Sequence, residues 1–254
     1  MQSLPIWIYW DNIESDKMPA YIELCIETIK KNCGPLFEVH LVNAKNVKDY
    51  LPKINPRYKD IRHEGSPIGH PKNTSVMTAY IRVQLLKTYG GVWMDADTIL
   101  LKDLSFVWQD LGTDGFVACH KTKTINGISN GFIASAKNGV IINKYAAEQE
   151  ALLKTRTEFK WGEIGLRMMS PIVFSNMDHC KLIDESLLHP IIWEDWQAFF
   201  RISSKVIMNE DVIAITLFNS LFKKSPYYEI LFSDKDKVLK DEFLISFLLR
   251  KALQ

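Results

Sequence analysis

The segment from Tyr89 to Asp97 constrains the fold more than any other part of the chain, because it joins a helix end, an apolar strand and two carboxylates. Gly90 and Gly91 predict the end of a helix, and the apolar residues after them predict a buried strand. Asp95 and Asp97 lie one residue apart, so in extended chain their side chains leave the same face. Paired carboxylates at a strand end predict a site for a hard divalent cation, Mn²⁺ or Mg²⁺, which can neutralise a diphosphate.

The composition is that of a globular protein without a nucleic-acid partner. The 254 residues are 47% hydrophobic, which is enough for one large domain with its own core. A net charge of +1 lacks the clustered basic excess that nucleic-acid binding requires. The first residues lead straight into an apolar segment, so no signal peptide is expected, and no apolar run approaches the ~18 residues that span a bilayer. The four cysteines lack metal-ligand spacing, which predicts reduced thiols in a cytoplasmic protein; pairing of Cys25 with Cys33 is the alternative.

Strand and helix patterns alternate along the chain, which favours a layered α/β fold. An irregular, proline-containing loop is expected at 52–71. Beyond Thr155 the pattern weakens, except for an apolar segment at 212–222. No repeat or linker interrupts the chain, which favours one domain. The predicted strands are 4–10, 37–42, 91–97, 115–120 and 131–136, and the predicted helices are 19–31, 47–51, 73–89, 140–153 and 237–253.

These segments resemble those of bacterial capsular polysaccharide synthesis proteins, relatives of the sugar-binding-region Asp-x-Asp glycosyltransferases. The resemblance is carried by residues 4–12, 25–28, 37–41, 80–97, 130–132 and 215–220. It implies a GT-A fold, a single Rossmann-like nucleotide-diphospho-sugar transferase domain over residues 1–254 with a mixed central sheet and a C-terminal helical segment. Within that domain, 1–136 would bind the nucleotide sugar, and 137–254 would form the acceptor side and the C-terminal helices.

The same resemblance implies a reaction. A hexosyl group would move from a nucleotide sugar, a UDP-sugar, to a growing glycan or lipid-linked glycan of a bacterial capsule or lipopolysaccharide, with retention at the anomeric carbon. Retention needs either front-face attack or a covalent intermediate, and the sequence leaves both open. In similar enzymes one carboxylate binds the metal and the other holds the ribose or a metal-bound water. We expect Asp97 to be the closer metal ligand, with Asp95 beside it.

Other candidate site residues each have a structural alternative. The resemblance implies that Arg82 contacts the donor, whereas a surface arginine with an apolar stem is the alternative. It implies that Trp10 stacks on uracil, whereas a core position is the alternative. Tyr9, just before it at the end of the first strand, is a second candidate for binding the nucleotide sugar. Asn130 and Gly131 predict a polar contact to the sugar, or only a turn before a strand.

Polar residues late in the chain carry weaker signals. Asn219 and Ser220 have oxygens that suit a metal shell, or they are only polar residues on a helix surface. His189 and the segment 193–196, with two tryptophans, suggest a platform for the acceptor, whereas core packing is the alternative. The apolar helix expected at 237–253 either docks on the domain or a partner, or contacts the inner face of the cytoplasmic membrane.

Two positions depart from the family pattern. Relatives commonly have Ser-Asp three residues before the helix arginine, where this chain has Thr78 and Ala79, and a late histidine where it has Thr216. Both changes remove polar contacts at the donor site, which leaves a weakly active or non-catalytic sugar-binding relative as a second candidate. A sugar nucleotidyltransferase is a third, but Asp11 and Asn12 follow the first strand instead of a Gly-rich basic loop.

Overall fold

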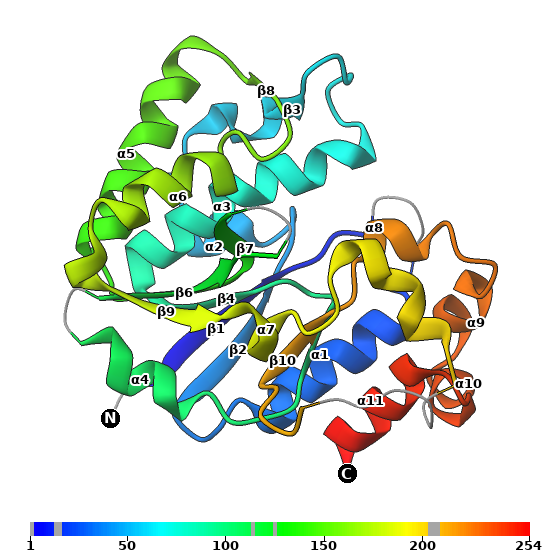
Figure 1. The fold of residues 1–254 in the computed structure, drawn as a ribbon. Helices are drawn as coiled ribbons and strands as arrows, with labels where there is room; N and C mark the ends of the chain where they lie inside the picture. The colour runs from blue at the N-terminus through cyan, green and yellow to red at the C-terminus, as the bar shows by residue number, and fades with distance from the viewer. Residues whose placement is uncertain (1–2, 13–16, 113–114, 124–125, 203–208) are drawn as a thin grey trace.

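The chain forms a six-stranded mixed sheet with helices on both faces, as the computed structural model shows (Figure 1). The structure describes residues 3–12, 17–112, 115–123, 126–202 and 209–254. The sheet strands are Leu4–Tyr9 (β1), Phe37–Val42 (β2), Gly91–Met94 (β4), Phe116–Lys121 (β6), Gly127–Ser135 (β7) and Cys180–Asp184 (β9). Their order is β2-β1-β4-β7-β6-β9, in which β7 runs antiparallel to β4 and β6 and the other pairs are parallel. The predicted mixed central sheet is confirmed.

Two small ladders and a set of helices complete the described fold. The ladders join Arg62–His63 (β3) to Glu158–Phe159 (β8) and Thr98–Leu100 (β5) to Ala214–Thr216 (β10). The α-helices are Ala20–Asn32 (α1), Val47–Tyr50 (α2), Thr74–Tyr89 (α3), Ser105–Leu111 (α4), Val140–Thr155 (α5), Leu166–Phe174 (α6), Glu185–Leu188 (α7), Asn219–Phe222 (α8), Tyr228–Ser233 (α9), Lys235–Lys240 (α10) and Leu244–Leu253 (α11). Short 3₁₀ helices lie at Pro56–Asp60, Pro71–Asn73, Met177–His179 and Trp193–Phe200.

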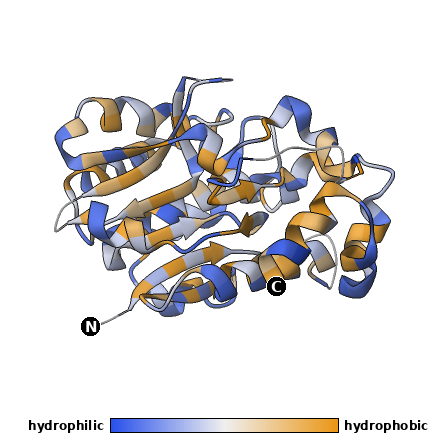
Figure 2. Cartoon of the chain, turned by 60° about the horizontal axis from the view of Figure 1, so that its bottom comes forward, coloured by the Kyte–Doolittle hydropathy of each residue, from blue (hydrophilic) through white to orange (hydrophobic). Residues whose placement is uncertain are grey.

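The sheet separates two apolar cores because successive side chains of a strand point to opposite faces. In β1, Ile6 and Ile8 face the core built with α1, β5 and α11, whereas Trp7 faces the core built with α3 and α5. Figure 2 shows hydrophobic residues along the strands and on the helix sides that cover them. The inner strands β1 and β4 are covered on both faces and are nearly continuous apolar runs. Trp7 is 2% exposed, so it is a core residue.

The sequence predicted the first half of the fold better than the second. The predicted strands and helices up to residue 153 all appear, although β4 ends at Met94 and β7 begins at Gly127, both earlier than expected, and β5 and α4 were not predicted. The pattern missed β9 and the helices from α6 to α7, since these elements are short or contain Pro171. The expected disulfide alternative is not formed, because all four cysteines are free.

The single helix expected at 237–253 is wrong, because the chain breaks into α10 and α11. Phe243 between them is extended and pairs with Ile202 in an isolated β-bridge. The backbone nitrogen of Leu244 donates to the carbonyl oxygen of Arg201 (2.8 Å). These contacts with a distant segment satisfy backbone groups that a continuous helix would have satisfied internally.

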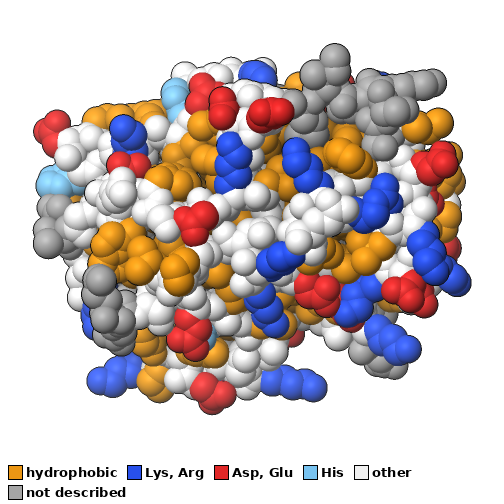
Figure 3. Space-filling view, turned by 90° about the horizontal axis from the view of Figure 1, so that it is seen from below, with side chains coloured by type: hydrophobic (Ala, Val, Ile, Leu, Met, Phe, Trp, Pro, Cys, Tyr) orange, Lys and Arg blue, Asp and Glu red, His pale blue; other side chains and the backbone are white. Residues whose placement is uncertain are grey.

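The C-terminal helices dock on the domain, as one of the two alternatives predicted. Ile245, Leu248 and Leu249 of α11 are buried in the core that includes α1, while Phe247 is 42% exposed. Lys235 at the start of α10 forms ion pairs with two glutamates of α1 (2.9 and 3.3 Å). On the face seen from below, basic and acidic side chains are interspersed among apolar ones (Figure 3). Within the described chain, none of the helices is both long enough and apolar enough to cross a membrane.

Candidate active site

The paired carboxylates follow the C-terminal end of β4. The strand ends at Met94, and Ala96 and Asp97 form a turn that leads into β5. The expected extended conformation through Asp97 is therefore wrong, because the chain turns to enter the β5–β10 ladder. Asp95 and Asp97 nevertheless remain neighbours across this turn, and the charge of Asp95 contributes to the raised pKa of Asp97.

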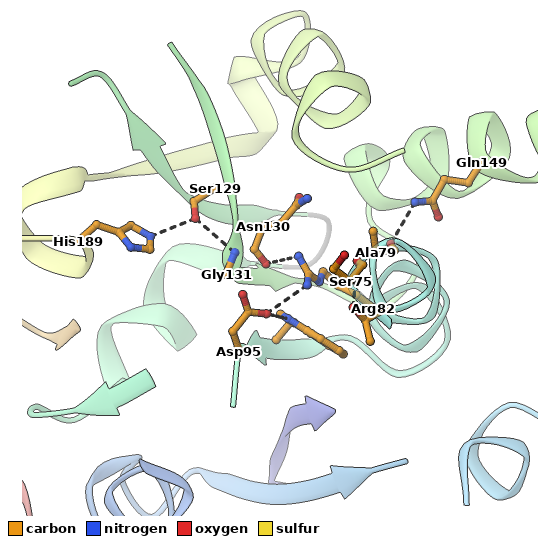
Figure 4. Close-up of polar contacts among 11 residues, drawn as sticks. Ser75, Ala79, Arg82, Asp95, Ser129, Asn130, Gly131, Gln149 and His189 are labelled. Carbon is orange, nitrogen blue, oxygen red and sulfur yellow. Dashed lines mark hydrogen bonds and ion pairs between the residues drawn. The ribbon is translucent and has the colours of Figure 1, made fainter. Parts of the chain in front are cut away.

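Protein donors hold one oxygen of Asp95 in place. Its Oδ1 accepts hydrogen bonds from Nη2 of Arg82 (3.1 Å) and Nε1 of Trp93 (2.8 Å). Its backbone nitrogen donates to the carbonyl oxygen of Gly131 (3.0 Å), which ties the turn to β7. The guanidinium of Arg82 also lies over the Trp93 ring, 4.6 Å from its centroid. Figure 4 shows Arg82 reaching toward Asp95 from α3. Oδ2 of Asp95 receives no hydrogen bond from the described residues, so it is the oxygen left to meet a ligand.

Arg82 is a buried positioning residue rather than a surface arginine. It is 5% exposed, and its Nη1 donates to the carbonyl oxygen of Asn130. Both terminal nitrogens are thus directed at the protein, and Nε is buried without a hydrogen-bond partner among the described residues. Burial lowers the pKa of Arg82, while the charge of Asp95 opposes that effect. The side chain therefore fixes Asp95 and β7 relative to each other.

Asp97 is half-buried and bonded to the start of α8. Its Oδ2 accepts a hydrogen bond from the backbone nitrogen of Asn219 (2.7 Å), and its carbonyl oxygen accepts one from Leu217 (2.9 Å). Burial, and after it the charge of Asp95, raises the pKa of Asp97 to about 6. The amide oxygen of Asn219 accepts a hydrogen bond from the Tyr21 hydroxyl. The predicted ligand Asn219 is therefore brought next to Asp97 from far along the chain.

The residues at the end of β1 differ in exposure. Trp10 is half-buried, and its Nε1 donates to Oδ1 of Asn12 (2.9 Å). Tyr9 is 6% exposed, and its hydroxyl donates to the carboxylate of Asp11. Because β1 and β4 are parallel neighbours, Trp10 and Asp95 both lie at the carboxyl ends of these strands. Ligands of open α/β sheets bind at the carboxyl ends of the strands.

A pocket of about 180 Å³ opens on the β7 side of the carboxylates. Neither Trp10 nor Asp97 lines it, but Asn130 does, and Gly131 next to it closely approaches Asp95. A Cβ added to Gly131 would lie 3.2 Å from Oδ2 of Asp95, so the glycine gives this oxygen room. The pocket is lined by His63, Ser75, Val76, Ala79, Lys121, Ser129, Asn130, Trp161, Gly162, Glu163, Ile164, Gly165 and Leu166.

Hydrogen bonds from two side chains of α5 hold the loop that forms one wall of this pocket. The carbonyl oxygen of Ile164 accepts hydrogen bonds from Nε2 of Gln149 (2.8 Å) and from the Tyr145 hydroxyl (2.9 Å). Nε2 of Gln149 also donates to the carbonyl oxygen of Ala79 (3.0 Å), a contact visible in Figure 4. Gln149 is fully buried, so one side chain ties the α3 wall to the loop wall. Trp161 on the same loop is 61% exposed.

His189 does not join the aromatic residues that follow it in sequence. It is 4% exposed, and its Nε2 shares a hydrogen bond with Oγ of Ser129 (3.0 Å). Burial lowers the pKa of His189 to about 3, so the ring is neutral. Trp196 packs against Phe200 and Phe222, whereas Trp193 is 47% exposed. His189 thus bonds to Ser129 of β7, and the acceptor platform at 193–196 stays a prediction.

The sequence did not single out Lys121 and Trp161, which line the pocket, or Gln149, which ties two of its walls together. The sequence gives no sign of the role of Gln149, because a glutamine inside a helix has no evident role until the residues that it contacts in the folded protein are known. Lys121 ends a strand like many lysines, and Trp161 lies in a region without clear periodicity. The local sign of a loop at Trp161 is the pair Gly162 and Gly165 that follows it, and the exposure of the tryptophan cannot be read from the sequence.

The oxygen atoms of the carboxylate site suit a hard cation that is bound partly by the protein and partly by a substrate. Among the described residues, no cluster of three or more His, Cys, Asp or Glu could hold a metal. Two carboxylates and the Asn219 amide oxygen form an all-oxygen donor set, which suits Mg²⁺ or Mn²⁺ rather than a soft metal. Mg²⁺ is commonly held by one or two carboxylates together with substrate phosphates.

A mixed sheet with paired carboxylates at the end of an inner parallel strand defines the GT-A class of fold. The chain belongs to the family of capsular polysaccharide synthesis proteins, whose sequence profile matches residues 1–158. Over 155 residues it is 24% identical to the O-glycosyltransferase braB of Annulohypoxylon truncatum, covering 55% of this chain and 35% of that protein. The chain therefore spans about a third of the length of this curated relative.

Solved structures agree with the fold. The apo form of the glycosyltransferase GlyE of Streptococcus pneumoniae TIGR4 superposes with a TM-score of 0.53 at 14% identity, covering 100% of this chain and 61% of that one. The bifunctional glycosyltransferase WbbM gives a TM-score of 0.51 at 12% identity, covering 99% of this chain and 52% of that one. These similarities confirm the predicted GT-A fold and, with the profile match, the predicted family.

Proposed function

We propose that this chain is a glycosyltransferase that moves a hexosyl group from a UDP-sugar to a bacterial surface polysaccharide, a capsule or lipopolysaccharide, with retention. The observation that carries the proposal is the placement of Asp95 and Asp97 at the edge of the sheet, next to a pocket of about 180 Å³. Family membership and the fold support the transferase class. The acceptor in this proposal is a growing glycan or a lipid-linked glycan.

In this proposal Asp97, Asp95 and Asn219 hold Mn²⁺ or Mg²⁺. When bound, the cation supplies positive charge that stabilises the leaving nucleoside diphosphate. Oδ2 of Asp95 faces the site because Arg82 and Trp93 occupy its other oxygen. Arg82 acts through Asp95 and the Asn130 carbonyl, so it orients the site without touching the sugar in this conformation.

The remaining roles follow from position. Trp10 stacks on the base at the β1 end of the edge, and Asn130 contacts the sugar on the β7 side. Glu163 lines the pocket, but Arg156 and the backbone of Lys160 already occupy its carboxylate. A paired carboxylate is a poor nucleophile, which favours front-face attack by the acceptor over a covalent intermediate.

Four free cysteines support a cytoplasmic location.

A hydrolysis assay tests the proposal. UDP-glucose, UDP-galactose and their N-acetyl and uronate forms are incubated with the protein and Mn²⁺, and released UDP is measured. Slow hydrolysis of at least one donor that stops in excess chelator is expected. If UDP binds and no donor is cleaved in the presence of metal, the protein is a non-catalytic sugar-binding relative. Ala79 in the pocket wall is the observation that favours this second candidate, because alanine offers the sugar no hydrogen bond.

Replacing Trp10 with alanine is expected to weaken UDP binding by about 1–3 kcal/mol, the range for loss of a base–aromatic stack. Titration calorimetry with UDP measures the change. Trp108→Ala is the matched control, since Trp108 is 41% exposed on α4, away from the sheet edge. Equal UDP affinity of folded Trp10→Ala and wild-type protein would place the base elsewhere.

A further inference from the structure

The pocket beside Asn130 carries a positive charge that the described protein does not neutralise. Lys121 ends β6 and lines the pocket, and no ion pair joins it to a described carboxylate. Glu163 is the acidic residue of the lining, and its carboxylate is taken by Arg156 and by the backbone nitrogen of Lys160 (2.9 Å). The lining therefore has an excess of one unpaired ammonium group.

The two histidines near the pocket are neutral. Burial lowers the pKa of His63, whose ring shares a hydrogen bond with Ser75 (2.9 Å). His189, behind Ser129, has its pKa lowered to about 3, first by burial and then by the charge of Lys121. The buried carboxylate of Glu185 accepts hydrogen bonds from the backbone nitrogens of Thr122 and Lys123 (2.9 Å each) and does not line the pocket. A ligand in this pocket therefore meets the ammonium group of Lys121 as the unpaired charge of the lining.

The pocket also contains an unused hydrogen-bond acceptor. Oδ1 of Asn130 is buried and has no partner among the described residues. The backbone of Asn130 is fixed by Arg82, so its amide is held at the pocket wall. A buried polar atom left unpaired is costly, and a ligand that donates to it removes that cost. The bound group therefore carries both a hydroxyl or N–H donor and a negative charge.

The size and place of the pocket indicate one sugar ring. A volume of about 180 Å³ holds roughly six waters at ~30 Å³ each, which is space for a single pyranose. Gly131 joins Asn130 to Asp95, so a sugar attached to a diphosphate at the carboxylates reaches this pocket. We infer that the donor's sugar is a hexuronate, whose carboxylate pairs with Lys121 while a ring hydroxyl donates to Asn130. This inference rests on the proposed transferase function.

A matched donor pair tests it. UDP-glucuronate and UDP-glucose differ only in a carboxylate against a hydroxymethyl group, and UDP-galacturonate with UDP-galactose repeats the comparison with the other orientation at C4. Affinities are measured by calorimetry with Mn²⁺ at pH 7.5, with UDP alone as reference. Wild-type protein is expected to bind one uronate at least about tenfold more tightly than its neutral partner, the scale of one charge-assisted hydrogen bond.

Variants of one side chain separate the charge from other effects. Lys121→Gln is expected to lose the uronate preference while keeping its affinity for UDP, and Lys121→Arg is expected to retain the preference. Lys123→Gln is the control, because Lys123 is exposed and lies outside the pocket. The substitution removes the same charge two residues away. Ala79→Asp adds a carboxylate to the pocket wall and is expected to shift the preference toward the neutral sugar.

The outcomes distinguish this inference from the function on which it rests. Binding of UDP with equal affinity for both members of each pair would overturn the hexuronate assignment and leave the transferase proposal standing. The same holds if Lys121→Gln keeps the full preference of the wild type. Failure to bind UDP or any of the donors would overturn the transferase proposal, and the donor assignment with it.

Discussion

Replacing Asp97 with asparagine is expected to reduce sugar transfer or donor hydrolysis by about 100-fold or more without destabilising the fold. Removal of a single group that stabilises developing charge commonly costs 100- to 1,000-fold in rate. Asparagine keeps an oxygen that can accept the hydrogen bond from the Asn219 backbone nitrogen (2.7 Å in the wild type). It removes the charge that would bind the cation.

A measurement of stability distinguishes the loss of the cation site from unfolding of the Asp97→Asn protein. Because burial and Asp95 raise the pKa of Asp97, its ionised form is disfavoured in the folded state. The free energy of unfolding of Asp97→Asn at pH 7.5 is therefore expected to equal or exceed that of the wild type. Asp110→Asn, an exposed aspartate of α4, makes the same change away from the site. Full turnover by Asp97→Asn, or by wild type in excess chelator, would eliminate the metal role.

Replacing Arg82 with methionine is expected to lower both stability and activity. The variant leaves the Asp95 carboxylate with the Trp93 hydrogen bond but no counter-charge, and it leaves the Asn130 carbonyl without its side-chain donor; breaking such a buried pair costs about 3 kcal/mol. That figure is the low end of the range, because the Asp95 side chain is 35% exposed while Arg82 is 5% exposed. Urea unfolding measures the loss. Arg82→Lys is expected to lie between, since one ammonium cannot reach both partners with the geometry of a guanidinium.

A second substitution shows whether Arg82 acts through Asp95. In the Arg82→Met, Asp95→Asn double variant the unpaired charge is gone, so part of the stability is expected to return while activity stays low. The exposed pair of Arg62 with Glu158 is the matched control, because Arg62→Met at the surface should cost about 1 kcal/mol or less. An Arg82→Met protein with wild-type stability and turnover would contradict the positioning role.

The sequence alone determined the parts of this protein that depend on neighbouring residues. The apolar run of β1, the alternation of β2, the periodicity of α1 and α3, and the glycine stop before β4 are local signals, and the structure has each of these elements. The carboxylates after β4 could be found in the same way, because their meaning comes from the strand just before them. The family resemblance supplied the fold that the profile and the solved structures confirm.

Tertiary structure decided the remainder, because the interactions concerned join residues far apart in the chain. Asn219 comes next to Asp97, 122 residues away, and Gln149 bonds to Ala79, 70 residues away. The direction in which Arg82 points depends on Asn130, and the charge of Lys121 matters only because Glu163 in the same pocket is already paired. A local pattern cannot specify which distant group meets a side chain, since many distant groups are compatible with it. Folding selects one set by satisfying buried polar groups and apolar surface together.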